Sequence, residues 1–129
     1  MQFRLNFVDD YGFAYSYLPK VLSGIAQLLL NSRANLYEEY LQKEWGIDAS
    51  IPEILGVIFS SLDITTEGTD LVIRISNTKM FEGKKVIIYA QFLEYGNTEL
   101  KGLNLITKTF DYAKRHMGSL QSAYKLGMK

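Results

Sequence analysis

The sequence predicts an α+β fold, in which a small antiparallel β-sheet packs on a long N-terminal helix, with a further helix at the C-terminal end. Three observations lead to this prediction: alternating apolar residues at the N-terminus, a long apolar stripe at helical spacing after them, and a similar stripe near the C-terminus. With 129 residues, 47% of them hydrophobic, the chain is long enough for one domain, 1–129, with a substantial core.

The N-terminal segment alternates between apolar and polar residues. Phe3, Leu5 and Phe7 share one face of a predicted strand. Asp9-Asp10 then interrupts the pattern as a turn, and the aromatic residues of 11–17 indicate a hairpin; a helix beginning near residue 11 is the competing interpretation. This aromatic row fits core packing and a subunit contact equally well, because aromatic residues are enriched in both settings.

A long helix is predicted from about Leu18 to Trp45. Pro19 suits its first turn, and Gly46 suits the position just after its end. The apolar stripe that defines it consists of Leu22, Ile25, Leu29, Leu36 and Tyr40, widened by Ala26, Leu30, Tyr37 and Leu41.

A second helix is predicted from just after Ser50 to about Leu62. Ser50 suits its N-cap, Pro52 its first turn, and Glu53 the third position of a capping box. The residues expected to be buried on this helix are Ile54, Leu55, Ile58 and Phe59.

A β-hairpin is predicted from two segments rich in β-branched residues, 71–75 and 86–90. The polar residues 76–85 between them would form its long loop. A short strand near Ile64–Thr66 is expected to join the same sheet.

The last predicted helix runs from Leu103 to about Lys125. Its apolar residues step by four and three, which is the spacing of one helix face. The stripe consists of Ile106, Phe110, Ala113, Met117, Leu120 and Tyr124.

Charge and cysteine content narrow the classes of function. Fourteen basic and fourteen acidic residues cancel, which argues against a dedicated nucleic-acid binder and removes net repulsion between copies. The chain has no cysteine, so disulfides and thiolate chemistry are excluded. Neither a signal peptide nor a membrane-spanning segment is recognisable, so we expect a soluble intracellular protein or one released without a signal.

No catalytic motif is recognisable, and we expect no enzymatic activity, cofactor or metal site. His116, the one histidine, has no acidic residue three or four positions away, so we expect a solvent-facing helix residue. The adjacent carboxylates Asp9-Asp10 and Glu38-Glu39 point apart, as neighbours in strands and helices do. A turn and a solvated helix face account for these two pairs.

Three lysines, Lys79, Lys84 and Lys85, lie in the predicted hairpin loop. The glycine spacing around them does not match a phosphate-binding loop. The loop is therefore either a solvated hairpin tip or a basic finger that meets DNA phosphates.

The segment 89–102, YAQFLEYGNTELKG, is the least ordinary part of the chain. Its local pattern predicts an apolar face that ends at Gly96, where positive φ would let the chain turn. Glu94 would cap a backbone amide or meet a basic group of a neighbour. Residues 89–98 resemble the Tyr-Ala-x-x-(Val/Leu)-Glu-(Tyr/Phe)-Gly-Thr signature of small tail-component proteins of long-tailed bacteriophages, the neck and tail-completion proteins.

The order of predicted elements over Leu18–Lys125 is also similar to that family. The chain departs from it after the signature, where a proline-bracketed segment of the family is replaced by the proline-free LKGLNLITKTF. A second departure is IDASIPEILG, which stands where the family has a Pro-Val-x-Thr-Gly element.

The resemblance implies a structural virion protein of the neck or tail end that assembles as a ring in head–tail joining or tail completion. It implies a homo-oligomer that contacts other phage neck or tail proteins, in the host cytoplasm during assembly and then in the virion, and no membrane. DNA passing through a channel would be touched only transiently and non-specifically.

The resemblance also selects candidate residues. The signature and interface candidates are Tyr89, Phe92, Glu94, Tyr95 and Gly96, and the loop candidates, which would face a neighbour or the lumen, are Lys79, Lys84 and Lys85. Two other classes remain open. One is a small intracellular protein-interaction module, such as an adaptor or a toxin–antitoxin partner, and the other is a small hydrolase or ligand-binding domain built from scattered carboxylates.

Overall fold

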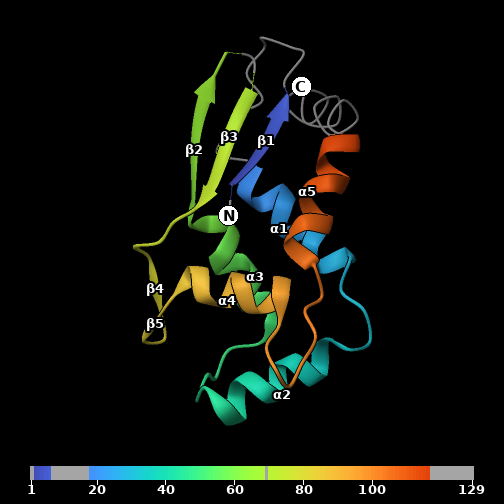
Figure 1. The fold of residues 1–129 in the computed structure, drawn as a ribbon, viewed down its shortest axis with the longest axis vertical. Helices are drawn as coiled ribbons and strands as arrows, with labels where there is room; N and C mark the ends of the chain where they lie inside the picture. The colour runs from blue at the N-terminus through green and yellow to red at the C-terminus, as the bar shows by residue number, and fades with distance from the viewer. Residues whose placement is uncertain (1, 7–17, 69, 117–129) are drawn as a thin grey trace, which may run out of the picture.

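The computed structural model describes residues 2–6, 18–68 and 70–116, which form five helices and two small antiparallel sheets. Figure 1 shows a three-stranded sheet at one end of the molecule, helix α2 (Ala34–Glu44) at the other end, and the remaining helices between them. The predicted α+β class is confirmed, since the helices and strands are mixed along the chain and the strands are antiparallel.

The larger sheet has the order β1–β3–β2, with β3 (Asp70–Ile75) in the centre, β1 (Gln2–Asn6) on one side and β2 (Leu62–Glu67) on the other. Ile73 lies opposite Phe3 in β1 and Ile64 in β2, and this face packs on the helices. The strands predicted near residues 3–5, 64–66 and 71–75 are therefore confirmed.

The predicted hairpin between 71–75 and 86–90 is wrong. Residues 86–90 begin helix α4 (Val86–Tyr95), and 71–75 pairs with β1 and β2 instead. The β-branched residues of 86–88 suggested a strand, but strand preference is weak and depends on packing. Burial in this segment follows the helical period, at Val86, Tyr89, Ala90 and Leu93.

The predicted single helix from Leu18 to Trp45 is also wrong. Helix α1 (Leu18–Leu28) and helix α2 are separated by a turn around Asn31. The Asn31 side-chain oxygen accepts from the backbone N–H of Arg33 at 2.8 Å, and its backbone carbonyl accepts from Ala34 at 3.1 Å. Asparagine side chains compete with helical hydrogen bonds in this way, so the apolar stripe continues while the helix does not.

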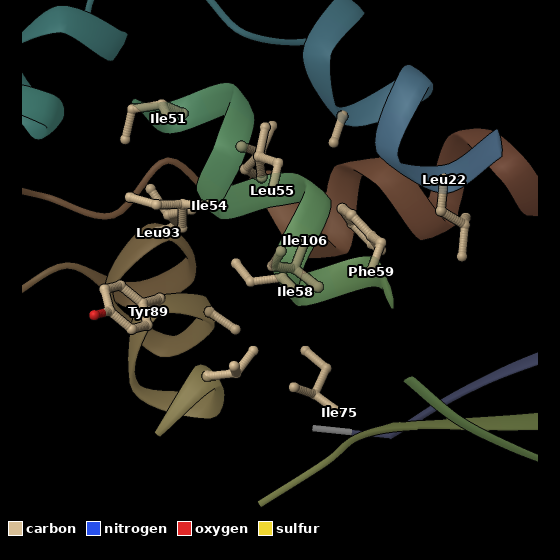
Figure 2. Packing of buried hydrophobic residues seen from close by; sticks show 14 of the residues in the cluster. Leu22, Ile51, Ile54, Leu55, Ile58, Phe59, Ile75, Tyr89, Leu93 and Ile106 are labelled. Atoms are coloured by element: carbon tan, nitrogen blue, oxygen red, sulfur yellow. The ribbon is translucent and has the colours of Figure 1, made fainter. Parts of the chain in front are cut away.

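Helix α3 (Ile51–Ser60) lies at the centre of the core. Its N-cap is Ser50, whose hydroxyl accepts from the Glu53 N–H at 3.3 Å, which confirms the predicted start. Figure 2 shows α3 with Leu22, Tyr89 and Ile106 of three other helices around it. The four side chains predicted to be buried on α3 are all buried, namely Ile54, Leu55, Ile58 and Phe59.

Helix α5 (Leu105–Arg115) closes the core next to β1. The Phe110 ring stacks on Phe3 with 3.9 Å between ring centroids, so it ties the helix to the sheet. His116 follows α5 and is exposed, as predicted, with its ring 4.3 Å from that of Tyr112. The buried part of the predicted stripe is Ile106, Phe110 and Ala113. Met117, Leu120 and Tyr124 lie outside the described residues, as do Phe7, the turn at Asp9-Asp10 and the second strand of the predicted hairpin, 11–17.

Two glycines lie inside helices with open space around them. A Cβ added to Gly24 or Gly56 meets nothing within 4 Å, and neither residue has positive φ. We expect Gly24→Ala and Gly56→Ala each to raise the free energy of unfolding by about 0.5–1 kcal/mol, because glycine loses more backbone entropy on folding. Urea unfolding followed by circular dichroism measures this change, and a loss of stability in both variants would contradict it.

Candidate assembly site

The signature-like segment forms the end of α4 and a closed loop that leads to α5. Gly96 ends the helix with φ of 71°. It also forms an isolated antiparallel β-bridge with Lys101. Within the loop, the Asn97 N–H donates to the Leu100 carbonyl at 2.8 Å. The Asn97 side-chain oxygen accepts from the N–H groups of Glu99 and Leu100 at 2.9 and 3.0 Å. The loop is thus held by its own hydrogen bonds.

Two glycines allow the loop to close. A Cβ on Gly96 would lie 2.1 Å from the Leu100 carbonyl oxygen, and a Cβ on Gly102 would lie 2.2 Å from that of Glu94. Both distances are far inside van der Waals contact, so only glycine fits. The exit at Gly96 with positive φ is confirmed; the requirement at Gly102 was not foreseen, because it depends on how the two sides of the loop approach each other.

Glu94 caps the helix that follows the loop. Its side chain is 3% exposed, and one carboxylate oxygen accepts from the Thr107 N–H at 3.1 Å while the other accepts from the Thr107 hydroxyl. Asn104, the N-cap of α5, makes no side-chain capping bond, so the carboxylate supplies the missing acceptor at the positive end of the helix. Of the two alternatives that the sequence left open for Glu94, the structure shows the cap for a backbone amide.

Helix α2 holds the same loop through hydrogen bonds and ring contacts. The Tyr37 hydroxyl donates to the Lys101 carbonyl, and the Asn97 amide donates to the Tyr40 hydroxyl at 2.9 Å. The ring of Phe92 lies 5.5 Å from Tyr40 and 5.1 Å from Trp45. Residues 89–102 therefore form one packed unit with α2.

The candidate Tyr89 is buried and hydrogen-bonded. Its hydroxyl donates to the Phe81 carbonyl at 2.7 Å. Burial raises the pKa of Tyr89 above its usual 10.0, and the negative charge of Glu82 acts in the same direction. The phenol therefore stays protonated at neutral pH and remains a donor.

The three candidate lysines lie on a short β-hairpin, residues 79–85, which we call the finger. Its strands are β4 (Met80–Phe81) and β5 (Lys84–Lys85), joined by a turn in which Glu82 and Gly83 have φ of 48° and 80°. The Lys84 ammonium lies 5.6 Å from the centre of a Trp45 ring, while Lys79 and Lys85 are exposed. The finger projects from one side of the molecule (Figure 1).

The finger is held by hydrogen bonds at its tip and at its base. A Glu82 carboxylate oxygen accepts from the Asp48 N–H at 3.1 Å, and the Lys79 carbonyl accepts from the Val86 N–H at 2.9 Å. These contacts join the tip of the finger to the chain before α3 and its base to the start of α4.

The signature candidates divide by exposure. Tyr89, Phe92 and Glu94 are buried, and Gly96 is confined by the loop backbone. Tyr95 is 68% exposed, and Ile88, seven residues earlier on α4, is 40% exposed on the same side of the helix. Tyr95 is therefore the signature candidate whose side chain is available to a partner.

An open groove of about 490 Å³ lies between α1 and α3, lined by Pro19, Lys20, Ser23, Gly24, Gln27, Gly56 and Ser60. This lining contains no carboxylate, so the groove does not gather the scattered acids that the hydrolase alternative requires. Among residues 2–6, 18–68 and 70–116, no three His, Cys, Asp or Glu side chains are grouped as a metal site would need. In the same part of the chain, no helix has the length and apolar character needed to cross a bilayer.

Comparisons of the chain with protein-family models, with curated proteins and with solved structures gave no significant match.

Proposed function

We propose that this chain is a structural protein of a long-tailed bacteriophage, assembling with copies of itself as a ring at the neck or tail end in head–tail joining or tail completion. It acts through contacts with its own copies and with other neck or tail proteins, not through catalysis. The observation that carries the proposal is the signature-like segment 89–98.

Three of the signature-like residues have specific structural tasks, which supports this proposal. Glu94 caps α5, Gly96 permits the tight exit from α4, and Phe92 packs on α2. Residues with such tasks would be retained together in a family, and Tyr95 remains on the surface for a partner. The β2–β3 hairpin precedes the segment and α5 follows it, whereas the expected long N-terminal helix is two helices, α1 and α2, and the expected hairpin of 71–75 with 86–90 does not form.

Native mass spectrometry of the purified protein at increasing concentration tests the proposal. We expect a series that ends in one assembly of fixed copy number, because a closed ring has no free binding surface left. A strict monomer or dimer at every concentration would contradict ring assembly and favour the protein-interaction module instead.

A further inference from the structure

We draw no further inference here: the strongest candidate, the open groove between α1 and α3 in which Gly24 and Gly56 leave room for a close approach, is a surface lined mostly by small residues, and nothing in the described part of the structure shows what covers it.

Discussion

Gly96→Ala is expected to lower the free energy of unfolding by about 3–5 kcal/mol, from backbone strain and steric overlap together. The residue has φ of 71° and ψ of −159°, a conformation that residues with a Cβ rarely adopt. The added Cβ would also lie 2.1 Å from the Leu100 carbonyl oxygen and 2.3 Å from the Gly102 nitrogen. These are backbone atoms of a hydrogen-bonded loop, so the overlap cannot be relieved by a side-chain rotation.

The matched control is Gly46→Ala. Gly46 also has positive φ, 66°, but nothing lies within 4 Å of its Cβ position, so the cost should be about 1–2 kcal/mol. Urea unfolding measures the loss of stability in both variants. Gly46→Ala reports backbone strain alone, and Gly96→Ala reports strain and steric overlap together. Equal losses of stability in the two variants would show that the loop around Gly96 is not closed as described.

Glu94→Ala is expected to lower the free energy of unfolding by about 2–4 kcal/mol, because it leaves the Thr107 N–H without its partner inside the protein and removes a negative charge from the start of α5. Glu94→Gln keeps an acceptor at the same place and should cost about half as much. Glu99→Ala changes an exposed acid in the same loop and should stay within about 0.5 kcal/mol of the unaltered chain.

A double-mutant cycle isolates the contact between the Glu94 carboxylate and the Thr107 hydroxyl. Thr107→Val removes the hydroxyl that donates to Glu94, so its effect should be smaller in the Glu94→Ala background than in the unaltered chain. Thermal unfolding of the four proteins provides the cycle. Additive losses would mean that the two side chains do not interact.

Local patterns predicted those parts of the fold that depend on near neighbours. The Ser50 cap, the end of α2 at Gly46 and the buried face of α3 each follow from residues within a few positions of one another. The turn around Asn31 was missed because an apolar stripe can continue through a change of helix. Helix α4 was missed because the window 86–90 was too short to distinguish a helical from a strand period, whereas 86–95 shows the helical one.

In the candidate site, too, local features were predictable from the sequence and contacts between distant residues were not. Gly96 and Glu94 are recognisable as a helix exit and a capping acid from the segment alone. The contacts that hold the loop on α2 are not, since Tyr37 and Lys101 are separated by 64 positions in the chain. The exposure of Tyr95 depends on the helical geometry of α4, which the predicted strand 86–90 did not anticipate.

Electron microscopy of the unaltered chain at high concentration tests self-assembly most directly. We expect rings with a central opening and one repeated contact between neighbours. Particles no larger than a single protomer under every condition tried would contradict it.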